Sequence, residues 1–111
     1  MDKFSVLQQY FGHSSFRPGQ EQVVDAIVSG QDVLDVMPTG AGKSVCYQVP
    51  AMLMPGLTLV ISPLISLMQD QVAALEEEGV HAACLNSALP EGLYSTILRA
   101  ALEGDYKILY V

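Results

Sequence analysis

The sequence predicts an α/β fold in which helices flank a parallel β-sheet, and two observations predict it. Short apolar runs typical of buried strands alternate along the chain with stretches that carry apolar residues at helical spacing. This alternation indicates βαβ units with right-handed crossovers. In addition, residues 33–47 run from an apolar stretch through a glycine-rich turn into a helical pattern, which is the usual context of a phosphate-binding loop.

Two helices are expected before the first strand. Residues 3–11 have apolar side chains at helical spacing, and Gly12 is expected to end this helix. A polar turn follows, and Pro18 opens a second helix. This helix should run to about Ser29, because Gly30 is a typical stop signal.

Each later element also has a sequence signal. Apolar runs predict strands at residues 32–37, 57–62, 81–86 and 106–111. Helical patterns predict one helix after the glycine-rich turn and two more over residues 64–78 and 90–103. Pro50 should kink the first of these helices, since proline removes one backbone hydrogen bond. Asp35 is unusual in a buried strand and requires either a partner or a wet edge.

The turn between the first strand and the next helix has the residues that phosphate binding requires. Small residues let backbone N–H groups surround an anion, and the helix N-terminus adds partial positive charge. Lys43 would reach the β- and γ-phosphates of a nucleotide, and the hydroxyl of Ser44 would bind Mg²⁺. Met37 stands where the strict pattern has its first glycine, so an ordinary glycine-rich turn with an exposed lysine stays open at this point. The predicted loop residues are Thr39, Gly40, Ala41 and Gly42.

Composition limits the partners and the location that we expect. The 111 residues carry a net charge of −7 with only 5 lysines and arginines, which argues against a broad basic face for nucleic acid. The 2 cysteines are far apart and have no histidine pair nearby, so reduced thiols are expected rather than a zinc site. We see no secretion signal and no apolar run of about 20 residues, so a soluble, cytoplasmic protein is expected.

Four blocks of the sequence resemble the start of a RecQ-type DNA helicase of superfamily 2. FGHSSFRPGQ resembles the first motif of that family, and MPTGAGKS resembles its phosphate loop, in which Met is usual at the first position. VISPLISLMQDQV resembles its motif Ia, and AACLNS follows at the family's spacing. The blocks are specific in combination and span essentially the whole chain. The resemblance implies the N-terminal part of a first RecA-like lobe, with a P-loop NTPase sheet that is incomplete at the C-terminus.

The same resemblance implies an activity and its ligands. It implies an enzyme that binds ATP and Mg²⁺ and couples ATP hydrolysis to 3′-to-5′ DNA unwinding in recombination and repair. Its partners would be single-stranded DNA and duplex junctions, with no membrane, and a zinc site is expected only in a downstream region. Residues 1–30 would hold a short helix and an adenine-recognition motif, and residues 31–111 would hold the phosphate-loop core.

The resemblance also gives roles to individual residues. Arg17 and Gln20 resemble the pair that recognises adenine, and a carboxamide suits the N6/N7 edge because it offers both a donor and an acceptor. His13 falls where the family often has an aromatic ring that stacks on the base, and imidazole is a smaller platform. The segment that resembles a DNA-contacting motif includes Ser62, Leu64, Gln69 and Asp70. The alternative for all these residues is structural, as a polar turn before one helix and the polar face of another.

Several parts of the family pattern are expected beyond Val111. They are the acidic box that binds Mg²⁺ and activates water, the aromatic-rich DNA loop, the second lobe with its arginine finger, and the winged helix. The chain alone is therefore expected to be inactive. Two other classes stay open: a small P-loop kinase, for which Asp35 is poorly placed, and a non-catalytic nucleotide-binding module. ATP hydrolysis with and without single-stranded DNA separates the three classes.

Overall fold

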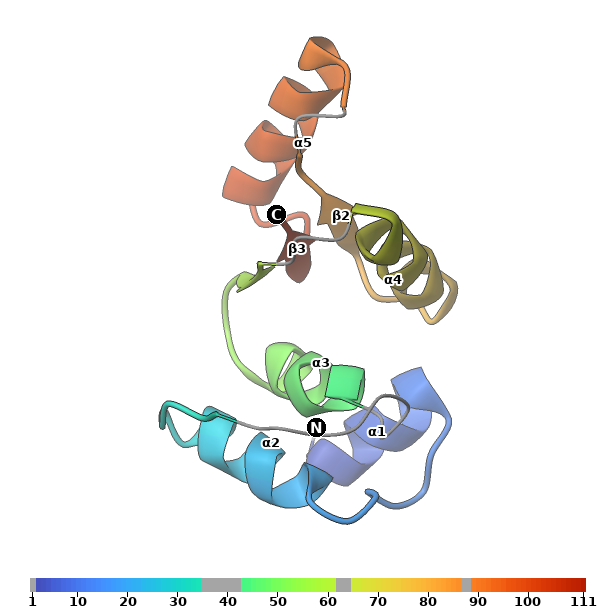
Figure 1. Cartoon of the computed structure of the whole chain (residues 1–111), viewed down its shortest axis with the longest axis vertical. Coiled ribbons are helices and arrows are strands. Elements are labelled where there is room, and N and C mark those ends of the chain that lie inside the picture. The colour runs from blue at the N-terminus through green and yellow to red at the C-terminus, as the bar shows by residue number, and fades with distance from the viewer. Residues whose placement is uncertain (1, 35–42, 62–64, 87–88) are drawn as a thin grey trace. The chain divides into compact units, whose positions relative to one another are not determined.

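The computed structural model of the chain describes residues 2–34, 43–61, 65–86 and 89–111. These residues form two compact units, Met1–Pro55 and Gly56–Val111. The first unit is helical in its described part, and the second contains strands as well as helices (Figure 1). The division that the sequence predicts after residue 30 is a division by function, and it stays a prediction.

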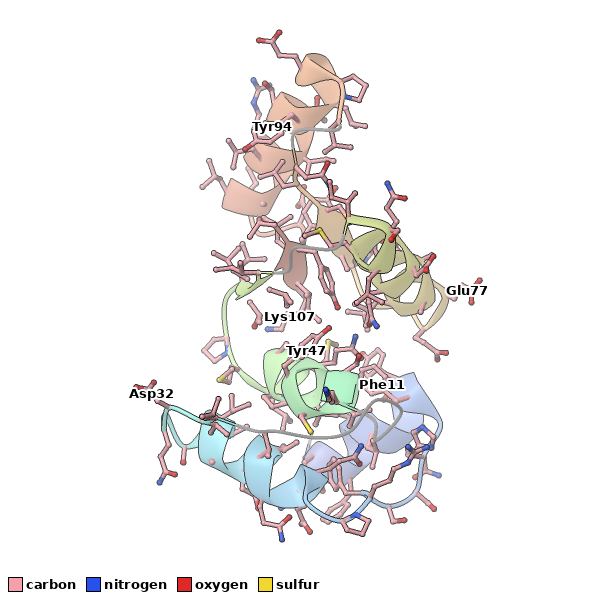
Figure 2. All side chains as sticks on the ribbon, in the orientation of Figure 1. Phe11, Asp32, Tyr47, Glu77, Tyr94 and Lys107 are labelled. Carbon is pink, nitrogen blue, oxygen red and sulfur yellow. The ribbon has the colours of Figure 1, made fainter. Side chains whose placement is uncertain are left out.

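The first unit consists of α1 (Lys3–Phe11), α2 (Gln20–Val28) and α3 (Lys43–Leu53). α3 packs against both α1 and α2 (Figure 1). Apolar residues from all three helices form one buried core, because each helix turns an apolar stripe inward. The core residues are Val6, Leu7, Val24 and Val49, and partly buried aromatic side chains such as Phe11 pack against them (Figure 2).

The ends of α1 show why this segment is a helix. The Asp2 carboxylate accepts a hydrogen bond from the backbone N–H of Ser5 at 2.8 Å, which caps the N-terminus of the helix. This bond from Ser5 lowers the pKa of the Asp2 carboxyl. At the other end, Gly12 has a left-handed φ of 72°, and its N–H donates to the carbonyl of Gln8 at 3.2 Å. The predicted bounds of this helix are confirmed.

The second unit consists of β1 (Thr58–Val60), α4 (Ile65–Glu77), β2 (Ala82–Cys84), α5 (Glu91–Leu102) and β3 (Ile108–Tyr110). Its strands form a parallel sheet in the order β1-β3-β2, so β3 is the central strand. All of β3 is buried, as expected for a central strand that is covered on both faces. Parallel strands separated by helices confirm the predicted α/β pattern.

The core of the second unit includes a buried cluster of Ala83, Leu85, Ala101 and Leu109. Other buried apolar residues of this unit are Met68, Leu75, Val80, Ala82, Ile108 and Tyr110. α5 has an apolar pattern at helical spacing, but Leu93 and Leu98 on it are 46% and 40% exposed. A helix buries its whole apolar face only against a surface of matching width, and each strand of this sheet has only 3 residues.

The first predicted strand, at residues 32–37, is not seen in the residues that the structure describes. Residues 31–34 have no regular secondary structure, and the side chain of Leu34 is 94% exposed. An extended segment becomes a strand only by pairing with a neighbour, and each described strand pairs within the second unit. The prediction is therefore wrong for residues 32–34. Asp35 and the glycine-rich turn at residues 38–42 lie outside the described residues.

Candidate nucleotide site

The turn before α2 brings Arg17 and Gln20 together. The backbone N–H of Arg17 donates to Oε1 of Gln20 at 2.7 Å, and the backbone N–H of Gln20 donates to the carbonyl of Arg17 at 3.1 Å. Gly19 between them has φ of 88°, a conformation that favours glycine, and Pro18 has a fixed φ that suits the start of a helix. The Arg-Pro-Gly-Gln turn is thus closed by a reciprocal pair of hydrogen bonds, in which the Gln20 side chain at the start of α2 reaches back to a backbone N–H before the helix.

This closed turn fixes the direction of the Gln20 carboxamide. Gln20 is only 4% exposed although its side chain is polar. The bond from Arg17 identifies the oxygen of the amide, because a backbone N–H requires an acceptor. The amide nitrogen must then face the opposite way, and a fixed amide is what reading one edge of a base requires. The same hydrogen bond also closes the turn that leads into α2, so Gln20 has a structural role as well.

The two other side chains of the predicted adenine site are more accessible. His13 and Arg17 both have exposed side chains. The backbone N–H of His13 donates to the carbonyl of Leu7 at 3.3 Å, which places His13 directly after the end of α1. A hydrogen bond therefore joins the backbone of Arg17 to the side chain of Gln20, whereas the side chain of His13 is exposed to solvent.

α3 begins at Lys43, where the sequence predicts the helix of a phosphate-binding loop. Lys43 is exposed and Ser44 is half-buried. The first turn of α3 contains no acidic residue, so no carboxylate there opposes an anion at the helix N-terminus. These residues fit a bound phosphate by their chemistry and by their place on the helix. The predicted loop residues outside the described part of the chain are Thr39, Gly40, Ala41 and Gly42.

α3 also contains a buried polar residue for which the sequence predicts no role. Gln48 lies one turn after Ser44 and is only 5% exposed. A buried carboxamide is costly unless it forms hydrogen bonds, so such a residue is usually held in one orientation. Its signal in the sequence is its position within an apolar stretch of the helix, which by itself does not reveal a role.

The residues predicted to contact DNA are only partly described. Gln69 and Asp70 are exposed on α4, whereas Ser62 and Leu64 lie outside the described residues. Exposed polar side chains are also typical of the solvent face of an amphipathic helix, so their exposure alone does not indicate DNA.

The described residues contain neither a metal-binding cluster nor a membrane-spanning helix. Among residues 2–34, 43–61, 65–86 and 89–111, no group of three His, Cys, Asp or Glu side chains could hold a metal ion. In the same part of the chain, no helix combines the length and the apolar character that crossing a membrane requires.

The sequence matches a family model over most of its length. Residues 17–111 match the model of the DEAD/DEAH box helicases. The match begins at Arg17 and includes the predicted phosphate-binding loop, α3 and the whole second unit.

Relatives from several organisms extend this match toward the N-terminus. An ATP-dependent DNA helicase RecQ of Haemophilus influenzae is 52% identical over 107 residues, which cover 96% of this chain and 17% of the relative. The RecQ helicase of Bacillus subtilis is 47% identical over 108 residues, 96% of this chain and 18% of the relative. The ATP-dependent DNA helicase Q-like 4B of Arabidopsis thaliana is 47% identical over 103 residues, 91% of this chain and 9% of the relative.

The chain therefore belongs to the DEAD/DEAH box helicase family, and its relatives place it in the RecQ branch of that family. It spans less than a fifth of the length of these relatives, as the 17% and 18% coverages show. Membership of the family confirms the predicted RecA-like α/β fold, to which the described parallel sheet and its helices belong.

Proposed function

We propose that this chain forms the ATP-binding part of a RecQ-type DNA helicase, in which ATP hydrolysis drives DNA unwinding. The observation that carries the proposal is the start of α3 at Lys43, directly after the glycine-rich turn of a DEAD/DEAH-type sequence. The names of the relatives, ATP-dependent DNA helicases, support ATP as the ligand and DNA as the partner.

The phosphate groups of ATP would bind at the N-terminus of α3. Lys43 would place its ammonium against the β- and γ-phosphates and stabilise the charge that develops during phosphoryl transfer. Ser44 would bind the Mg²⁺ ion through its hydroxyl, and Mg²⁺ would supply further charge neutralisation. The backbone N–H groups of the loop would surround the phosphates. The loop residues in this proposal are Thr39, Gly40, Ala41 and Gly42.

The adenine would bind at the turn before α2, within the functional segment of residues 1–30. Gln20 would read the N6/N7 edge, Arg17 would assist it, and His13 would stack on the ring. DNA would contact the segment that follows β1 and the exposed face of α4. The DNA-contacting residues in this proposal are Ser62, Leu64, Gln69 and Asp70.

Substitution of Lys43 tests the phosphate site. In the full-length protein, Lys43→Ala should lower the kcat of ATP hydrolysis by about 10²-fold or more, because it removes a charge that acts in the transition state. Arg99→Ala is the matched control, since Arg99 lies on α5 in the second unit and its loss changes the net charge by the same amount. Near-normal turnover by Lys43→Ala would show that Lys43 has no role in the reaction.

A further inference from the structure

We infer that α1 holds the adenine-reading turn in place, with Lys3 and Phe4 as positioning residues that contact it on either side of Gln20. The inference rests on the proposed role of Gln20 in reading adenine. It concerns residues that lie before the part of the chain matched by the helicase family model, which begins at residue 17.

Lys3 binds the first turns of α2, directly after Gln20. Its Nζ lies 2.7 Å from Oε2 of Glu21 and 2.7 Å from Oδ1 of Asp25. The second oxygen of Asp25 is 2.9 Å away, so Lys3 contacts both oxygens of that carboxylate. These bonds, first those to Asp25 and then those to Glu21, raise the pKa of the Lys3 ammonium above its ordinary value.

Lys3 offsets the repulsion between Glu21 and Asp25. They are four residues apart on one helix and therefore share a face, where two carboxylates repel each other. Lys3 lies between them, and its side chain is only 23% exposed, so solvent reaches it less freely than a typical surface lysine. Without this ammonium, the repulsion would act on the residue next to Gln20 in the first turn of α2.

Phe4 contacts the other side of the same turn. Its ring centroid lies 5.6 Å from that of Phe16, with a tilt of 56° between the ring planes, which is a favourable arrangement for an aromatic pair. Phe16 directly precedes Arg17, whose backbone N–H orients the Gln20 amide. Lys3 also lies 5.3 Å from the centroid of the Phe4 ring, so the two positioning residues contact each other.

α1 therefore fixes the segment 16–21 at both of its ends. The two hydrogen bonds between Arg17 and Gln20 close the turn locally, but they do not set where the turn lies relative to the rest of the first unit. Phe16 and Glu21 supply those anchors through their contacts with consecutive residues of one helix. Loss of an anchor should change the position of the Gln20 amide while leaving the phosphate-binding end of α3 intact.

The test compares nucleotide with bare triphosphate in the full-length protein. Lys3→Met removes the charge and keeps the length of the side chain, and it should raise the KM for ATP by about two- to fivefold, the range expected of a partly exposed ion pair. The kcat at saturating ATP and the inhibition constant of inorganic tripolyphosphate should stay unchanged. Lys3→Arg keeps the charge and should have the KM of the unaltered protein. Arg99→Met makes the same change of charge in the second unit and should not change the KM for ATP.

Phe4→Leu and Gln20→Ala distinguish the positioning role of α1 from the adenine-reading role of Gln20. Phe4→Leu keeps an apolar side chain, removes the ring pair and should raise the KM for ATP in the same selective way. If Lys3→Met and Phe4→Leu lower the melting temperature but leave the ratio of ATP to tripolyphosphate affinity unchanged, α1 has only a structural role and the inference is overturned. If Gln20→Ala also leaves the ratio of ATP to tripolyphosphate affinity unchanged, Gln20 does not read adenine and the proposed function of this turn is wrong. If Gln20→Ala changes this ratio but Lys3→Met and Phe4→Leu do not, only the positioning role of α1 is overturned.

Discussion

At the residue scale, Gln20 is the side chain on which the adenine assignment depends. Its carboxamide accepts a bond from the Arg17 N–H and is almost fully buried. Gln20→Ala would leave that N–H without this acceptor. Loss of a partner for a buried donor typically lowers the free energy of unfolding by about 1–3 kcal/mol. In the full-length protein, the variant should weaken binding of ATP more than binding of tripolyphosphate, and competition assays with the two ligands measure the difference.

Gln20→Glu is the matched control for this experiment. A carboxylate keeps the acceptor that the Arg17 N–H needs, so the closed turn before α2 is retained, but it lacks the N–H₂ donor for the adenine N7. If Gln20 reads adenine, Gln20→Glu should also lose the preference for ATP. If Gln20→Glu binds ATP as the unaltered protein does, Gln20 acts only in closing the turn before α2.

The contacts of Gln20 could be predicted from the sequence, whereas those of Lys3 could not. Arg17 and Gln20 are three residues apart in an Arg-Pro-Gly-Gln turn, so local turn chemistry brings them together. Lys3 and Asp25 are 22 residues apart, and their contact depends on how α1 and α2 both pack against α3. No local pattern contains that information, so the ion pair is visible only in the structure.

At the scale of elements, helices follow the sequence more closely than strands do. Local signals set the bounds of α1, because Asp2 and Gly12 satisfy backbone groups at its two ends. The segment at residues 32–34 has an apolar pattern but no described pairing partner, and it is not a strand in the described residues. Strand formation depends on neighbours that are distant in sequence, and a pattern of apolar residues cannot supply them.

The cap of α1 gives this helix a dependence on pH. The bond from Ser5 holds the pKa of Asp2 below its ordinary value of 3.8. A lowered pKa means that the charged cap stabilises the folded helix above pH 3.8, and that this contribution is lost as the pH falls through the lowered pKa. Amide-exchange protection of residues 3–11 in the full-length protein should therefore decrease under acid conditions.

Asp2→Asn and Asp2→Ala test this account of the cap. Asparagine caps a helix about as well as aspartate but does not titrate, so Asp2→Asn should match the unaltered protein at neutral pH and lose less protection in acid. Asp2→Ala should lower protection at neutral pH as well. Equal protection in all three proteins at neutral pH would mean that Asp2 does not stabilise α1.

At the scale of the whole molecule, exposed apolar side chains predict association of the isolated chain. In the described part of the second unit, Leu59, Ile61 and Leu102 are 58%, 85% and 82% exposed. β1 is an edge strand of the described sheet, and an apolar edge strand can pair with a strand of another chain. The 111-residue chain alone should therefore scatter light increasingly with concentration.

Ile61→Lys should reduce this association, because a lysine at a sheet edge disfavours pairing. Gln69→Lys adds the same charge on the exposed face of α4 and is the matched control. Light scattering and thermal melting over a range of concentrations measure the effect. A cooperative melt of a monomer, independent of concentration, would contradict the prediction for the isolated chain.

The central claim is that this chain supplies the ATP site of a DNA-dependent motor. The most direct test is the rate of ATP hydrolysis by the full-length protein with and without single-stranded DNA. A RecQ-type helicase should hydrolyse ATP much faster when single-stranded DNA is present, and it should lose this activity in the Lys43→Ala variant. Turnover that is the same with and without DNA, or the absence of turnover under both conditions, would contradict the claim.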